Sequence, residues 1–149
     1  MKPVKIWVLI ADGARARIVE QTGVGRALRE VSGSEFSDDH LRNRDIVADR
    51  PGRSFDSGGR GRHAMVPPSD PQDLREKGFL TRLAGFVDEQ YAAGRFDRLV
   101  IAAPPSALGY LRSVLSEQVR QVVSAEVASD LTRLPNSKLA KHLEDVLAV

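Results

Sequence analysis

The chain has 149 residues, the size of a single domain, and its 42% hydrophobic and 28% charged residues exclude a disordered protein. The 22 Lys and Arg residues against 20 Asp and Glu residues leave a net charge of only +2, so the protein as a whole has no field that would hold nucleic acid, and any attraction to phosphate must be local. The chain has no cysteine, which excludes disulfides and thiolate metal sites.

The apolar run at the N-terminus is predicted to be a strand. It contains Lys5 and is not followed by a small-residue cleavage site, so we do not interpret it as a signal peptide. No apolar run approaches the roughly 20 residues that span a bilayer. We therefore expect a soluble, cytoplasmic protein that does not contact a membrane, and no motif indicates a cofactor.

The first two strands are predicted to form a hairpin. Residues 4–11 are mostly apolar, a second β-like run covers 14–20, and Asp12 and Gly13 stand between them. An Asp-Gly pair between two such runs indicates a tight turn whose two central residues have positive φ. A third antiparallel strand is expected within 26–34.

In this third strand, Leu28 and Val31 are the candidates for burial.

Helix and strand then alternate from residue 69 onward. Asp70 is a suitable N-cap, Pro71 suits the first helical position, and apolar residues recur at helical spacing until Gly94 ends the helix.

The remaining elements follow the same alternation. Residues 96–103 contain a short continuous apolar run, which is typical of a central strand covered on both faces. A helix from about Ser106 to Val122, a strand over 125–131 and a last helix from about Pro135 complete the chain. The apolar residues expected to be buried by the last helix are Leu139, Leu143, Val146 and Leu147.

This order predicts an α/β fold with a single domain over 1–149. Three hairpin-linked strands followed by a βαβ unit imply a mixed five-stranded sheet with helices on its faces and a right-handed crossover between the last two strands. The order of elements is that of an RNase H-like sheet. A long Arg/Gly-rich loop, about 37–68, interrupts it.

The loop is the candidate binding element. Residues 37–63 hold six Arg, five Asp, two His and four Gly, and no hydrophobic period is present. A loop of this length in a compact domain is usually functional or disordered. Arginines and glycines together suit phosphate, because guanidinium groups fork onto its oxygens and glycines let backbone N–H groups approach. The candidate binding residues are Arg50, Arg53, Gly58, Gly59, Arg60, Arg62 and His63. The alternative is a solvated loop whose Arg and Asp residues pair with one another.

Catalytic candidates in the loop are a carboxylate and an imidazole. Asp56 with His63, or Asp49 with His63, could move a proton near neutral pH. Asp12 invites comparison with the metal-binding acid of RNase H-type nucleases, but Asp in Asp-Gly is the ordinary hairpin residue. His142 has no partner at the spacing of a metal site, so no metal site is predicted.

Four phrases of the sequence resemble one family. They are ADGARARI (11–18), DRPGRSFDSGG with RHA (49–64), FDRLVIAAPPSALGYLR (96–112) and EVASDLTRLP (126–135). Together they are similar to the bacterial host-attachment proteins, described as required for attachment to host cells. That family is in turn similar to the central RNase H-like domain of archaeo-eukaryotic peptide-chain release factors, which carries a Gly-Gly-Gln loop.

The second resemblance places Gly58-Gly59 in the equivalent loop, with Arg60 where release factors have Gln. An Arg cannot accept a hydrogen bond from the hydrolytic water, so the resemblance implies binding more than hydrolysis. Our leading hypothesis is a binding protein whose loop contacts the phosphates of the ribosome, tRNA or rRNA. The alternatives are a protein-interaction or regulatory factor that affects attachment indirectly, with no partner indicated, and a peptidyl-tRNA or phosphodiester hydrolase.

Overall fold

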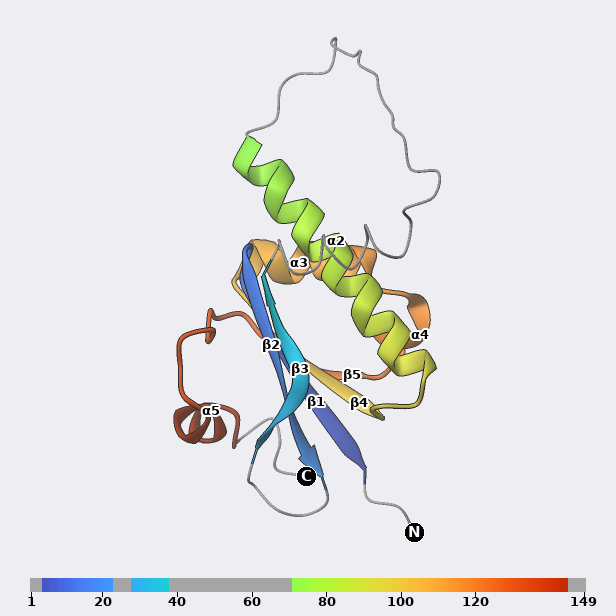
Figure 1. Ribbon diagram of the computed structural model, residues 1–149, viewed down its shortest axis with the longest axis vertical. Helices are drawn as coiled ribbons and strands as arrows, with labels where there is room; N and C mark the ends of the chain where they lie inside the picture. Colours follow the sequence, from blue (N-terminus) through green and yellow to red (C-terminus); the bar gives the residue numbers. More distant parts are fainter. Residues whose placement is uncertain (1–3, 23–27, 38–70, 145–149) are drawn as a thin grey trace.

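The computed structural model describes residues 4–22, 28–37 and 71–144, which form one mixed α/β domain (Figure 1). Its sheet runs in the order β3-β2-β1-β4-β5. The strands are β1 (Lys5–Ala11), β2 (Arg15–Thr22), β3 (Arg29–Ser37), β4 (Arg98–Ala102) and β5 (Val123–Val127). The first three strands are antiparallel, while β4 is parallel to both β1 and β5, so the predicted mixed sheet is confirmed.

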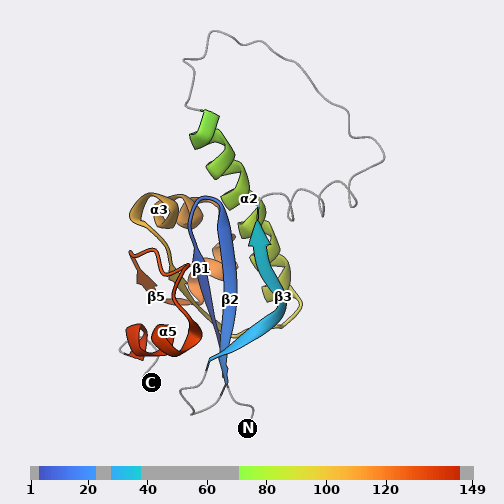
Figure 2. The same ribbon diagram turned by 60° about the vertical axis from the view of Figure 1, so that its left-hand side comes forward.

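The helices cover both faces of the sheet. They are α2 (Pro71–Ala92), α3 (Pro105–Val114), α4 (Glu117–Gln121) and α5 (Asn136–His142). The first three lie on one face and α5 lies on the other, as Figure 2 shows. The start of α2 at Pro71 and its end before Gly94, which has a φ of 75°, are confirmed. The predicted N-cap, Asp70, lies outside the described residues.

β1 lies between β2 and β4 in the sheet and is buried on both faces, because helices pack on both sides of the sheet. Its apolar run divides by alternation: Trp7 and Leu9 face α2 and α3, whereas Val8 and Ile10 face α5. The indole N–H of Trp7 donates to Glu20 on β2 at 2.9 Å, so this buried ring has a partner for its polar atom. β1 is therefore the centre of the two hydrophobic clusters.

The third strand is displaced from its predicted position. The strand was expected over 26–34 with Leu28 and Val31 buried, but it spans Arg29–Ser37 and those two side chains are only partly buried. Among the described side chains of this strand, Phe36 is buried, and it packs on Phe86 of α2 with ring centroids 4.6 Å apart. Phe36 lies among polar residues in the sequence, so the hydrophobic pattern did not indicate that it would be buried.

The single helix predicted from Ser106 to Val122 is wrong, because the structure has two helices there. Leu115 has an extended backbone (φ −71°, ψ 149°) and ends α3. Ser116 then caps α4: its side chain accepts a hydrogen bond from the backbone N–H of Val119 at 3.2 Å. The apolar residues Leu115 and Val119 remain buried on both sides of the break, which is why the periodicity did not reveal it.

Two further boundaries differ from the prediction. The last strand was expected over 125–131 but is Val123–Val127. Beyond it, Asp130 accepts hydrogen bonds from the backbone N–H of Thr132 at 2.9 Å and from the hydroxyl of that residue at 2.5 Å, which forms a turn instead of a strand. Leu131 is buried on the α5 face. The last helix begins after Pro135 as predicted, with Leu139 and Leu143 buried, whereas Val146 and Leu147 lie outside the described residues.

The predicted hairpin is present, but its turn has a different geometry. Gly94 is the one glycine of the described residues with positive φ, so Gly13 does not adopt the expected conformation. The carboxylate of Asp12 instead accepts the backbone N–H groups of Ala14 and Arg15, both at 2.8 Å. A side-chain cap on the turn thus replaces the positive-φ geometry.

Candidate functional site

Several elements begin or end at one end of the sheet. The carboxyl ends of the parallel strands β1, β4 and β5 lie there, and so do the hairpin tip and the first residue of α3. Ligands of open α/β sheets bind at this end of the strands. The first buried residue of α2 is Phe79, and the turns before it extend beyond the sheet (Figures 1 and 2).

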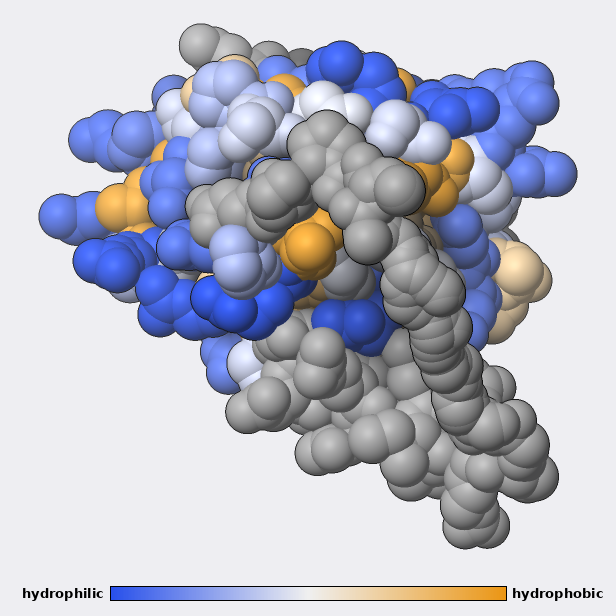
Figure 3. Space-filling model, turned by 90° about the horizontal axis from the view of Figure 1, so that it is seen from above, coloured by the Kyte–Doolittle hydropathy of each residue, from blue (hydrophilic) through white to orange (hydrophobic). Residues whose placement is uncertain are grey.

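The loop predicted to bind phosphate starts and finishes at the same end. Ser37 is the last residue of β3 and Pro71 is the first of α2, so the residues that flank the segment lie at this end. The predicted binding and catalytic residues lie outside the described residues: Asp49, Arg50, Arg53, Asp56, Gly58, Gly59, Arg60, Arg62 and His63. Seen from above, the described surface of this end is mainly hydrophilic (Figure 3).

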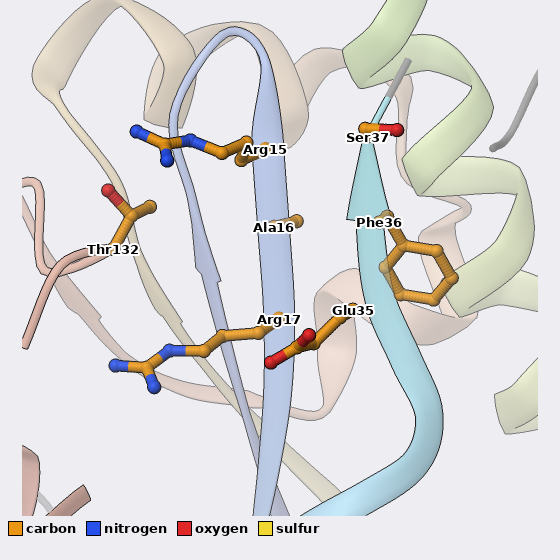
Figure 4. Close-up of a pocket in the computed structure, with 7 residues that line it drawn as sticks. All are labelled: Arg15, Ala16, Arg17, Glu35, Phe36, Ser37 and Thr132. Carbon is orange, nitrogen blue, oxygen red and sulfur yellow. The ribbon is translucent and has the colours of Figure 1, made fainter. Parts of the chain in front are cut away.

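A hollow of about 410 Å³ lies beside the point where the loop begins. It is lined by Arg15, Ala16, Arg17, Glu35, Phe36, Ser37 and Thr132. β2 and β3 pair here with Arg15 opposite Ser37 and Arg17 opposite Glu35, so these four side chains share the face of the sheet that carries α5. In Figure 4 the two arginines extend toward Thr132, while Phe36 points the other way.

Arg17 is held in place by neutral oxygens. Its guanidinium donates to the carbonyl oxygen of Leu134 and, at 3.4 Å, to the side-chain oxygen of Asn136. Its Nε is buried and has no hydrogen-bond partner in the part of the chain that the structure describes. The charged guanidinium is therefore oriented by the oxygens of a carbonyl and an amide, and its buried Nε–H donor remains unsatisfied.

The positive charge of Arg15 interacts with the carboxylate of Asp130. Burial raises the pKa of the Asp130 carboxyl, but hydrogen bonds from Thr132 and the positive charges of Arg133 and Arg15 outweigh it, so the net pKa is lowered. Asp130 is thus kept ionised and offsets part of the positive charge of its neighbours. Glu35 is a second carboxylate, on the β3 side of the hollow.

Asp12 is engaged as a structural residue of the hairpin, as its sequence context predicted. Its Oδ1 accepts both N–H groups of the turn, and its own N–H donates to the carbonyl oxygen of Arg15 at 2.9 Å. Across the described ranges, no group of three or more His, Asp or Glu residues is placed to hold a metal ion. His142, at the end of α5, is exposed.

The sequence interpretation missed the arginines of β2. Residues 14–20 were predicted to form a strand, but no prediction was made for the face on which Arg15 and Arg17 lie. The signal was present, because residues two apart in a strand lie on the same face. Two arginines at that spacing, at the start of a strand, predict a local positive patch.

Comparison with known proteins identifies the family of the chain. Within the described residues, no helix combines the length and the hydrophobicity needed to cross a membrane. No curated protein matches the sequence significantly. A family model described as "Protein required for attachment to host cells" matches residues 7–143. This range includes all the described helices and all the described strands, apart from the first two residues of β1. The chain therefore belongs to the family of proteins required for attachment to host cells.

Proposed function

We propose that this protein is a cytoplasmic, non-enzymatic binding protein that contacts RNA phosphate on the ribosome or on tRNA through its Arg/Gly segment. The observation that carries the proposal is the position of the Arg15 and Arg17 hollow beside Ser37, the residue from which that segment continues. Six arginines follow within residues 37–63, and the pairing of β2 with β3 places Arg15 opposite Ser37, where that segment begins.

The proposed ancestry is consistent with this role. Three antiparallel strands followed by two parallel ones support an RNase H-like fold related to the central domain of release factors. In that relationship Gly58-Gly59 corresponds to the Gly-Gly of the release-factor loop, and Arg60 replaces Gln. Arg donates hydrogen bonds and accepts none, which favours phosphate binding over activation of water.

Cosedimentation with ribosomes at two salt concentrations tests the proposal. Binding through phosphate releases counterions, so we expect much less protein in the ribosome pellet at the higher salt concentration. The variant Arg60→Ala/Arg62→Ala should pellet less than wild type at low salt. The control variant, Arg95→Ala/Arg98→Ala, loses the same charge from exposed positions near the opposite end of the sheet and should behave as wild type. Absence from the pellet at low salt would refute the proposal.

The family description favours one rival: a regulatory factor that acts on attachment through protein contacts. Under that rival, the protein would not pellet with ribosomes and would retain a protein partner whose binding does not depend on Arg60 and Arg62. An enzymatic role for Asp56 and His63 is tested separately with peptidyl-tRNA. Hydrolysis by wild type that is lost in His63→Gln would replace the binding proposal with an enzymatic one.

A further inference from the structure

We infer that the hollow between β2 and β3 is a phosphate site in its own right, with Arg15 and Arg17 as the residues that bind one backbone phosphate of the RNA. This inference rests on the proposed function and adds to it a fixed contact on the folded domain. The hollow of about 410 Å³ has the volume of a small-ligand site. Its two arginines lie two residues apart on one strand and extend to the same side (Figure 4).

Arg17 is prepared for an anion. Two of the five N–H donors of its guanidinium are used by the Leu134 carbonyl oxygen and the Asn136 side chain, which orient the group without neutralising it. The buried Nε–H has no partner among the described residues. A phosphate oxygen would satisfy a guanidinium N–H and supply the missing negative charge.

Arg15 adds a second positive charge that is only partly offset. Its charge acts on the carboxylate of Asp130, whose Oδ1 already accepts hydrogen bonds from the backbone N–H and the hydroxyl of Thr132. Arg133 also acts on Asp130. Among the described residues that line the hollow, Arg15 and Arg17 are positive and Glu35 is negative, so their net charge is positive.

Glu35 gives the inference a distinctive test. It lines the hollow opposite Arg17 in the register of β2 and β3, so its carboxylate repels an incoming anion. Glu35→Gln keeps the shape and removes this repulsion, so phosphate affinity should rise. If Arg15, Arg17 and Glu35 only formed ion pairs with one another and bound no anion, Glu35→Gln would not raise the affinity for phosphate.

The first experiment follows the arginine Nε–H and backbone amide signals of the full-length protein by NMR. The probe is uridine 5′-monophosphate, and uridine, which lacks the phosphate, is the control. We expect the signals of Arg15, Arg17, Ser37 and Thr132 to shift with the nucleotide and not with uridine. Inorganic phosphate should shift the same signals. No shift, or equal shifts with uridine, would overturn the site.

Variants identify the ligands. Arg15→Gln should weaken nucleotide binding by about tenfold, because one charge-assisted hydrogen-bonding group is lost. Glu35→Gln should strengthen it, and Arg98→Gln, an equal charge change at the start of β4, should leave it unchanged. Arg15 carries this test because Arg17 also supports the segment before α5. Unchanged affinity in Arg15→Gln would overturn the assignment.

The last arm separates the hollow from the proposed function. In Arg60→Ala/Arg62→Ala the nucleotide should still shift the signals of the hollow, even though ribosome binding falls. Arg15→Gln should also weaken binding of a 12-nucleotide oligouridylate and reduce its salt slope by about one. If wild type pellets with ribosomes but the hollow ignores the nucleotide, the inference fails alone. If the nucleotide binds but Arg15→Gln leaves oligouridylate binding intact, the RNA assignment fails.

Discussion

Gly13, in the β1–β2 turn, lies against Glu76 of α2 so closely that a Cβ atom on it would be 2.6 Å from the Glu76 Cδ and 2.7 Å from its Cγ. Its φ is not positive, so contact with the Glu76 side chain, and not backbone conformation, limits the space at this position. Glu76 in turn accepts a hydrogen bond from Gln72 at 3.1 Å. The hairpin tip therefore contacts the first turns of α2, next to the point where the Arg/Gly segment rejoins the domain.

Gly13→Ala should destabilise the protein by about 0.5–1.5 kcal/mol, because the Glu76 side chain must move to make room. In the Glu76→Ala background the same substitution should cost close to nothing. Gly85→Ala is the matched control: nothing lies within 4 Å of a Cβ there, so it should stabilise α2 by about 0.5–1 kcal/mol. Urea titrations of the four proteins of the cycle and the control measure these differences. An equal cost of Gly13→Ala in both backgrounds would mean that Glu76 is not the obstacle.

Ser116→Ala should lower the free energy of unfolding by about 1 kcal/mol, because the first turn of α4 loses its side-chain cap. Ser113→Ala is the comparison, because Ser113 is exposed in α3 and its hydroxyl donates only to the Tyr110 carbonyl oxygen of the same helix. It should change stability by less than about 0.5 kcal/mol. Thermal unfolding of both variants decides the matter. Equal losses would show that the break between α3 and α4 does not depend on this cap.

Asp130 should make stability depend on pH in the acid range. Its pKa is lowered from the ordinary 3.8 in the folded state, so its contribution is fully present above that value and is lost as the pH falls through the lower, folded pKa. Asp130→Asn should therefore flatten the fall in stability below about pH 4. Urea unfolding of wild type and variant at a series of pH values measures the slope. Identical slopes would contradict the placement of Asp130 beside Thr132 and Arg15.

Arg17 and Arg15 should differ in their effect on stability. Arg17→Gln removes the guanidinium that holds the Leu134 carbonyl oxygen, so it should destabilise the domain by about 1–3 kcal/mol and speed amide exchange in α5. For Arg15, no side-chain hydrogen bond is identified among the described residues, and Arg15→Gln should change stability by less than about 0.5 kcal/mol. Hydrogen exchange followed by mass spectrometry compares the two. Equal protection of α5 in both variants would remove the bracing role of Arg17.

Much of the fold was predictable because local chemistry and burial agreed. Pro71 marks the start of α2 and Gly94 follows its end, and the apolar run before Pro104 forms β4, an interior strand between β1 and β5. The break at Leu115 was missed because burial continues across it, although Ser116 followed by the acidic Glu117 is a sequence pattern of a helix start. Phe36 was missed because its burial depends on α2, which is distant in sequence.

The site was less predictable. The residues chosen from composition lie in the segment between β3 and α2, outside the described residues, and their role stays a prediction. The hollow depends on the pairing of β2 with β3 and on the turn at Thr132, which comes from the far end of the chain. Such long-range proximity is not encoded in the spacing of any one motif.

The most direct test of phosphate binding is a filter-binding titration of oligouridylate with wild type and Arg60→Ala/Arg62→Ala over a range of salt concentrations, with thermal melts of both proteins. We expect wild-type affinity to fall steeply with salt and the slope of the variant to be shallower by about two, with stability changed by less than about 0.5 kcal/mol. A wild-type affinity that is independent of salt, or a variant with unchanged slope and affinity, would contradict the account.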